Sequence, residues 1–155
     1  MRRPYFRPGT GTVIYNQIGE VLSFRRADFP DVWQLQQGGM EANEKLLATM
    51  WRELLEETGL TPAEILNVTP YPEWTIYAYN EDYNVAGKPE CLGQAHRWYF
   101  LELKPATVID LTNAHDQEFT HWQWTTFADL IAKTGELKKG IYTALNSYFT
   151  KNLPH

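Results

Sequence analysis

Cysteine, long apolar runs and basic residues are all scarce in this sequence, and each scarcity excludes something. Cys91 is the only cysteine among 155 residues, so no internal disulfide can form. We expect it to be a small core residue in a reducing compartment, the cytoplasm. No apolar run approaches the length of a transmembrane helix, and no apolar signal segment follows the basic start. We therefore expect no membrane partner.

Basic residues are outnumbered by acidic ones. Lysine and arginine total 14 against 19 aspartates and glutamates, which gives a formal net charge of -5. A nucleic-acid-binding module needs a contiguous basic stripe, and this charge balance argues against one. Any anionic substrate must be held by local basic residues and a metal ion, because the overall field does not attract it.

Hydrophobic and aromatic residues are plentiful, at 43% and 14%, and a chain of this length can bury a core without disulfides. We predict a single domain over residues 1–155. β-rich runs alternate with helical periodicity, which predicts an α/β fold with a mixed sheet between helices. We expect strands at 10–15, 21–26, 33–36, 65–69, 74–79, 94–103 and 118–124, helices at 127–132 and 137–148, and a polar loop over 80–93.

The stretch from Gly38 to Leu60, GGMEANEKLLATMWRELLEETGL, carries the clearest local signal. Asn43 is a good N-cap, and Gly59 suits the left-handed residue that ends a helix. A helix of about four turns is expected between them, with Glu44 on its first turn. Four residues at helical spacing fall in one line along this helix: Leu46, Met50, Glu53 and Glu57. One helix face therefore begins apolar and ends acidic.

Three carboxylates, Glu53, Glu56 and Glu57, crowd the end of this helix. They lie near the negative pole of the helix dipole with one arginine, Arg52, alongside, so they repel one another unless a cation lies among them. Mg²⁺ or Mn²⁺, hard ions that prefer oxygen ligands, would resolve the conflict. The alternative reading is an ordinary solvated face of a charged helix.

The spacing G-x5-E-x7-R-E-U-x-E-E-x-G-U, with U aliphatic, runs from Gly38 to Leu60. It resembles the signature box of the Nudix hydrolases at every defining position. The resemblance implies the Nudix fold, an α/β/α sandwich, and attack of water on a phosphorus of a polyphosphate chain. Such a displacement needs charge neutralised on the phosphate oxygens and a water oriented in line, which bound Mg²⁺ can supply.

The resemblance also implies a role for each acidic residue of the box. Glu53, Glu56 and Glu57 would bind metal, and one of them would be the general base, with no ranking among them. Arg52 would orient these glutamates, with Glu44 as its ion-pair partner. Outside the box, Glu118 would be a further ligand or the base, or else a surface charge.

Segments along nearly the whole chain look like the bacterial RNA pyrophosphohydrolase and dinucleoside polyphosphate hydrolase branch. They are Tyr5–Pro8, Trp33–Gln34, Gln37–Gly39, Gly93–Gln94, Arg97–Phe100, Glu118–Phe119 and Trp122–Trp124. The chain departs from the branch at two places. Gln36 stands where proline is usual, and Leu137 stands where an aromatic residue often precedes the lysine that Lys138 matches.

Candidate substrate-binding residues are basic, amide or aromatic. Arg7, Arg25 and Arg26 are phosphate clamps or only solubilising charges. Gly38 and Gly39 let backbone approach a ligand. Tyr77 and Trp74 would stack on a nucleobase or lie in the core. The remaining candidates are Gln94 and Lys138, whereas the four histidines show no paired metal spacing and are expected to be structural or exposed.

These features predict a Mg²⁺-dependent (or Mn²⁺-dependent) Nudix pyrophosphohydrolase acting on a nucleoside diphosphate linked to another group. RNA 5′-triphosphate ends or dinucleoside polyphosphates are the favoured substrates. Because of Gln36 and Leu137, a nucleoside diphosphate sugar or a modified nucleoside triphosphate stays open as an alternative. A non-catalytic nucleotide sensor is a further alternative, although such a protein normally loses carboxylates that this box retains.

Overall fold

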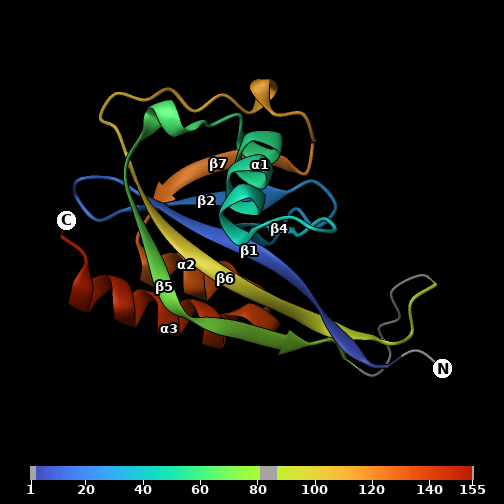
Figure 1. Ribbon diagram of the computed structural model, residues 1–155. Coiled ribbons are helices and arrows are strands. Elements are labelled where there is room, and N and C mark those ends of the chain that lie inside the picture. The colour runs from blue at the N-terminus through green and yellow to red at the C-terminus, as the bar shows by residue number, and fades with distance from the viewer. Residues whose placement is uncertain (1–2, 81–86, 155) are drawn as a thin grey trace.

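A seven-stranded mixed sheet lies between helices, as Figure 1 shows. The structure is a computed structural model that describes residues 3–80 and 87–154, so residues 81–86 of the expected loop over 80–93 lie outside the described residues. The strands are β1 (Tyr5–Tyr15), β2 (Val21–Arg26), β3 (Trp33–Gln34), β4 (Gln36–Gly39), β5 (Ile65–Ala78), β6 (Cys91–Leu103) and β7 (Phe119–Thr125). The α-helices are α1 (Leu46–Thr58), α2 (Phe127–Lys133) and α3 (Glu136–Asn152), and 3₁₀ turns span Pro62–Glu64 and Leu111–Asn113. The predicted α/β class with a mixed sheet is confirmed.

The sheet divides along one edge of β1. Strand β1 runs parallel to β6 over its whole length, and β5 continues the sheet antiparallel to β6. On its other edge β1 pairs with β2 at Tyr15 but with β4 from Gly9 to Thr12. Strands β3 and β7 instead pair with β2. Between β3 and β4 the chain therefore changes its pairing partner from β2 to β1, and the two glycines of β4 lie opposite Gly9 and Thr10 in the middle of β1.

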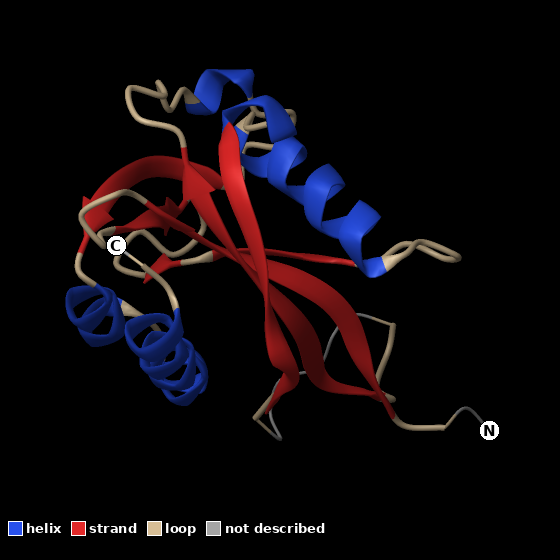
Figure 2. Cartoon of the chain, turned by 60° about the vertical axis from the view of Figure 1, so that its left-hand side comes forward, coloured by secondary structure: helices blue, strands red, loops and turns tan. Residues whose placement is uncertain are grey.

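Helices cover both faces of the sheet (Figure 2). On one face α1 packs Met50 and Leu54 onto Ile14, Leu101 and other apolar residues of the sheet. On the other face α2 and α3 pack onto a second cluster whose largest members include Trp98 and Tyr142. The alternation of side chains along β1 and β6 supplies both clusters, because successive residues point to opposite faces.

The ends of several elements differ from the prediction. Asn43 is not the N-cap: it adopts a left-handed conformation with φ 64°, and α1 begins only after Lys45. Glu44 therefore precedes the helix, in a turn closed by its N–H and the Glu41 carbonyl. Asparagine tolerates the left-handed region, so the same side chain suits a turn as well as a cap.

Other boundaries are confirmed or shifted: β1 begins at Tyr5 rather than at residue 10, β6 begins at Cys91 rather than at residue 94, and α3 ends at Asn152 rather than at residue 148. Gly59 ends α1 with φ 78°, and the capping box between Thr61 and Glu64 is present. The Thr126 side chain caps α2 by accepting a hydrogen bond from the Asp129 N–H. The two strands expected at 65–69 and 74–79 form one strand, β5, whose pairing with β6 is irregular between Pro70 and Trp74. No helix within the described ranges has both the length and the hydrophobicity to cross a bilayer.

Candidate active site

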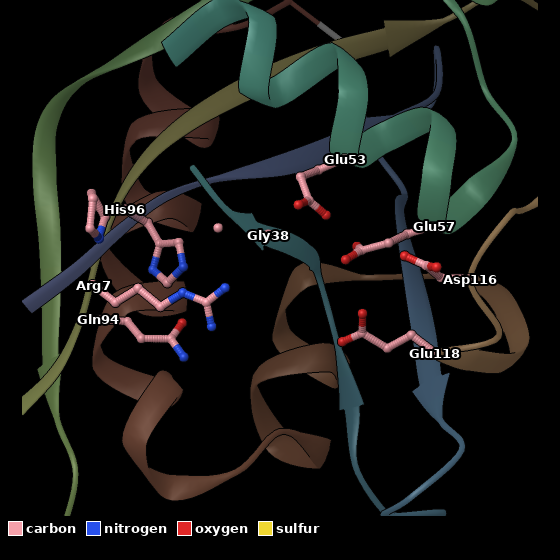
Figure 3. A pocket seen from close by; sticks show the side chains of 10 residues that line it. Arg7, Gly38, Glu53, Glu57, Gln94, His96, Asp116 and Glu118 are labelled. Carbon is pink, nitrogen blue, oxygen red and sulfur yellow. The ribbon is translucent and has the colours of Figure 1, made fainter. Parts of the chain in front are cut away.

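The acidic end of α1 forms one wall of a pocket of about 260 Å³. Met50 and Leu54 are fully buried and fix the helix on the sheet, so the same stripe carries Glu53 and Glu57 toward the pocket. The lining residues are Arg7, Pro8, Gly38, Gly39, Glu53, Glu57, Gln94, His96, Asp116 and Glu118. In Figure 3 the acidic side chains lie on one side, and Arg7, Gln94 and His96 lie on the other.

Arg52 does not line this pocket, but it binds the lining residue Glu53 and two further glutamates, Glu44 and Glu56. Its Nε and Nη2 donate to the two carboxylate oxygens of Glu44, at 2.7 and 2.9 Å. Nη1 donates to Glu53 at 2.8 Å and to Glu56 at 3.1 Å, and Nη2 also donates to the Gly39 carbonyl at 2.8 Å. These bonds match the five N–H groups of a guanidinium. The predicted Glu44 ion pair is confirmed, and no N–H remains for a substrate.

The carboxylates differ in how they are compensated. The Arg52 hydrogen bonds hold the pKa of Glu44 at about 2. Burial raises the pKa of Glu53, and the contact with Arg52 opposes that rise. Burial, together with the neighbouring charge of Glu118, raises the pKa of Glu57 to about 11. In the absence of a cation, Glu57 therefore holds a proton at neutral pH.

A hard divalent cation fits this donor set. Glu53, Glu57, Asp116 and Glu118 bring carboxylate oxygens to one pocket, and a cation would remove the conflict that keeps Glu57 protonated. Within residues 3–80 and 87–154, no three acidic side chains already converge tightly enough to enclose an ion.

Gln36 and Gly38 fit the β4 backbone against the glutamates. The Gln36 side chain is buried, accepts a hydrogen bond from Thr12 Oγ1 at 2.6 Å and donates to Glu57 Oε2 at 3.0 Å. A Cβ atom on Gly38 would overlap the carboxyl group of Glu53. Glycine at this position therefore leaves the space that Glu53 occupies.

The opposite wall is basic and polar. Arg7 lies beside Gly39, close enough that a Cβ on that glycine would lie 2.7 Å from its Nη2. Gln94 accepts from Gln37 Nε2 at 3.3 Å and donates to Tyr79 at 2.8 Å. His96 is almost fully buried, and burial lowers its pKa to about 3, so its ring is neutral.

Several predicted substrate contacts lie outside the pocket lining in the described part of the chain. Arg26 is paired with Asp28 through two hydrogen bonds and stacks over Phe29. Lys138 donates to Gln34 at 3.3 Å, and burial lowers its pKa to about 8 while Glu118 and Glu57 oppose that shift. Their roles as phosphate contacts stay predictions.

The two aromatic candidates lie in different environments. Tyr77 stacks on His96, with ring centroids 6.1 Å apart, and its hydroxyl accepts from Gln37. Trp74 is 44% exposed and lies against the Arg97 guanidinium. Tyr77 therefore contacts the pocket-lining residue His96 without being a lining residue itself, and Trp74 lies on the surface.

Three lining residues were not predicted as site residues from the sequence: Pro8, His96 and Asp116. Asp116 lies in a polar loop with no pattern, and its N–H bonds to the Glu56 carbonyl at 2.9 Å, which docks the loop on α1. His96 was expected to be structural or exposed, yet it lines the pocket, and Nδ1 has no hydrogen-bond partner within the described residues. Its position two residues after Gln94 on β6 was the available signal, because both side chains point to the same face.

A mixed sheet between helices, with a pocket that sets carboxylates opposite an arginine, defines the class of protein. Such a site suits metal-assisted chemistry on a phosphate chain. The chain belongs to the NUDIX domain family, which matches residues 5–145.

Named relatives agree with this family. RNA pyrophosphohydrolase from Shewanella pealeana is 33% identical over 146 residues, which cover 93% of this chain and 84% of that protein. The protein of the same name from Coxiella burnetii is 32% identical over 149 residues, 94% of this chain but only 65% of that protein. The resemblance to this branch and the assignment as a Nudix pyrophosphohydrolase are confirmed at the level of family and named relatives.

The fold itself agrees with solved structures. E. coli dihydroneopterin triphosphate pyrophosphohydrolase superposes with a TM-score of 0.75 at 23% identity, covering 92% of this chain and 97% of that one. The expected Nudix sandwich is therefore confirmed. The extent of the domain over residues 1–155, the cytoplasmic location and the roles of individual site residues stay predictions.

Proposed function

We propose that this chain hydrolyses a pyrophosphate bond in a nucleotide-type substrate, with RNA 5′-triphosphate ends or dinucleoside polyphosphates preferred, using Mg²⁺ or Mn²⁺. The observation that supports this most is the pocket wall of Glu53, Glu57 and Glu118 facing Arg7. Carboxylates alone would repel a polyphosphate, so a bound cation and Arg7 together make the pocket suitable for one. Nucleotide chemistry is also named for the relatives.

Each wall of the pocket has a share of the reaction. When bound, a divalent cation supplies charge neutralisation at the phosphate and activation of water. Glu53, Glu57 and Glu118 would hold the cation. Asp116, which also lines the pocket, and Glu56, which lies on the same turn of α1, are further candidate ligands. Arg7 donates N–H groups to phosphate oxygens, and Gly38 and Gly39 leave the room that the Glu53 carboxyl group and the Arg7 guanidinium occupy. One of the glutamates accepts the proton of the attacking water.

Substitution of the four glutamates proposed as metal ligands tests the proposal. Glu53→Gln, Glu56→Gln, Glu57→Gln and Glu118→Gln keep side-chain volume but remove ligand charge, so kcat should fall by about 10²-fold or more. Glu73→Gln, at an exposed position of β5, is the matched control and should keep wild-type kcat. Full activity in all four glutamine variants would exclude this mechanism.

A second substrate class has a specific observation in its favour. Leu137, which stands where an aromatic residue could stack on a base, is 44% exposed and offers no ring. Nucleoside diphosphate sugars and modified nucleoside triphosphates therefore belong in the same assay. A panel with Mg²⁺ that compares release of pyrophosphate with release of nucleoside monophosphate separates these substrates from RNA ends and dinucleoside polyphosphates.

A further inference from the structure

The side chain of Gln36 connects strand β1 of the sheet to Glu57 of the glutamate cluster. Gln36 is the first residue of β4 and pairs directly with Thr12 of β1. Both side chains are buried, each with 1% of its surface exposed, and Glu57 is 3% exposed. A buried polar chain thus leads from β1 through Gln36 to a pocket carboxyl group.

The chemistry of the three groups fixes the direction of this chain. An amide oxygen can only accept, so the Thr12 hydroxyl must donate its single hydrogen to Gln36 Oε1. That contact turns the amide nitrogen toward Glu57, where Nε2 donates to Oε2. If the amide flipped, its oxygen would face a carboxyl oxygen and its nitrogen would face a hydroxyl oxygen. An ionised Glu57 carboxylate only accepts hydrogen bonds, so Glu57 favours the orientation in which Nε2 faces it, and Thr12 holds the amide there by donating to Oε1.

We propose that Gln36 is a positioning residue, oriented by Thr12, that holds one oxygen of Glu57 so that the carboxylate presents its other oxygen to a divalent cation in the pocket. This role rests on the proposed function. Proline, the residue expected here from the branch resemblance, has no side-chain donor and could not make either contact. This chain therefore carries a support for Glu57 that proline at this position cannot provide.

The competing explanation is purely structural, because Thr12 and Gln36 also face each other across two paired strands. A register-keeping contact would affect stability alone. A contact that positions Glu57 would also change cation affinity and kcat, and outer hydrogen-bond partners of metal ligands typically change these by about 10–100-fold. Measuring cation binding to the folded protein separates the two explanations.

The test uses Mn²⁺ binding to the full chain without substrate, measured by calorimetry, together with kcat, KM and melting temperature. Gln36→Met removes the donor at similar volume and should weaken Mn²⁺ binding or lower kcat by about 10–100-fold. Thr12→Val should act in the same direction, whereas Thr12→Ser keeps the hydroxyl and should restore wild-type binding. The double variant Thr12→Val/Gln36→Met should resemble Gln36→Met alone, because Thr12 acts through Gln36.

Thr75→Val is the matched control. It makes the same change at a buried threonine whose hydroxyl accepts a hydrogen bond from Trp98 Nε1 at 2.8 Å, in β5. It should lower the melting temperature and leave Mn²⁺ affinity and kcat unchanged. If Gln36→Met behaves like Thr75→Val, the contact is structural and the positioning role is wrong. If wild type itself neither binds Mn²⁺ nor hydrolyses any nucleotide of the panel, the proposed function fails and this role fails with it.

Discussion

Single side chains decide how each carboxylate at or near the pocket is compensated. Arg52 satisfies Glu44, Glu53 and Glu56 with charged hydrogen bonds. Glu57 instead accepts a hydrogen bond from the neutral amide of Gln36. The pKa of Glu57 is raised, whereas the pKa of Glu44 is lowered. The pKa values of the carboxyl groups therefore differ, and Glu57 keeps its proton at the place where a cation is expected to bind.

Gly38 gives a prediction at the residue scale. In Gly38→Ala, the new methyl group would lie on the Glu53 carboxyl group and displace it. Because a displacement of about 1 Å in a reacting group can cost about 10²-fold, kcat should fall by one to two orders of magnitude. The displaced group is the end of a flexible side chain, so the melting temperature should change little.

Gly140→Ala is the control for this substitution. Gly140 lies in α3 and is exposed, and nothing in the described part of the chain lies within 4 Å of its Cβ position. Alanine there should leave kcat unchanged and stabilise the protein by up to about 1 kcal/mol, because alanine is the better helix former. Equal kcat values for Gly38→Ala and Gly140→Ala would show that the Gly38 contact does not position Glu53.

At the scale of elements, the site depends on how α1 ends. Gly59 turns the chain in the left-handed conformation, and the loop that follows β6 returns to this end, where Asp116 bonds to the last turn of α1. Asn113 packs directly on Gly59. The helix end therefore carries Glu53 and Glu57 and also anchors the loop that supplies Asp116 and leads into Glu118.

Local patterns predicted elements well and their junctions poorly. The line of Leu46, Met50, Glu53 and Glu57 follows from helical spacing alone, so sequence was enough to predict it. Asn43 instead adopts a left-handed conformation, and the next residue, Glu44, is bound by Arg52 from eight residues further along the chain. Asp116 could not be found because only the docking of its loop on α1 gives it a position. Tertiary contacts thus decided what spacing could not.

Gly59→Ala tests the helix end. A non-glycine residue at positive φ costs about 1–2 kcal/mol, and the added Cβ would lie 2.9 Å from Asn113 Cβ. We expect the free energy of unfolding, measured with denaturant, to fall by more than the conformational cost alone. Gly87→Ala provides the comparison, since Gly87 has φ 71° and no atom of the described residues within 4 Å of its Cβ position. Equal losses in both variants would show that the contact with Asn113 contributes nothing.

At the scale of the whole molecule, the divided sheet brings two faces to one pocket. Glu53 and Glu57 reach the pocket from the face that α1 covers. Gln94 and His96 lie on the same face of β6 as Trp98, which packs against α3, and Arg7 is paired with Gln94 on that face. The break between β2 and β4 along β1 allows both sets to meet. A net charge of -5 then coexists with a local arginine opposite the acids. The sequence predicts the acids as a motif, but this meeting depends on topology.

Glu57 links the stability of the whole fold to pH and to metal. Its pKa is about 11 in the fold and 4.5 ordinarily, so between these values the folded chain keeps a proton that the unfolded chain releases. Without metal, this group therefore lowers the free energy of unfolding as pH rises from about 4.5. Lys138 has the opposite sign, because its lowered pKa of about 8 makes folding more favourable as pH rises. Only the difference between wild type and Glu57→Gln isolates the carboxyl group.

Melting temperatures measured in chelator and in saturating Mg²⁺, from about pH 6 to about pH 9, should show this linkage. In chelator, wild type should lose melting temperature with rising pH relative to Glu57→Gln, whose amide cannot ionise. The increase caused by Mg²⁺ should grow with pH in wild type, because the cation needs the ionised carboxylate and displaces its proton. Calorimetry in buffers of different ionisation enthalpy should detect that released proton. Parallel pH profiles for the two proteins, with no proton release on binding, would mean that Glu57 is already ionised and that crowding at the helix end is relieved without a cation.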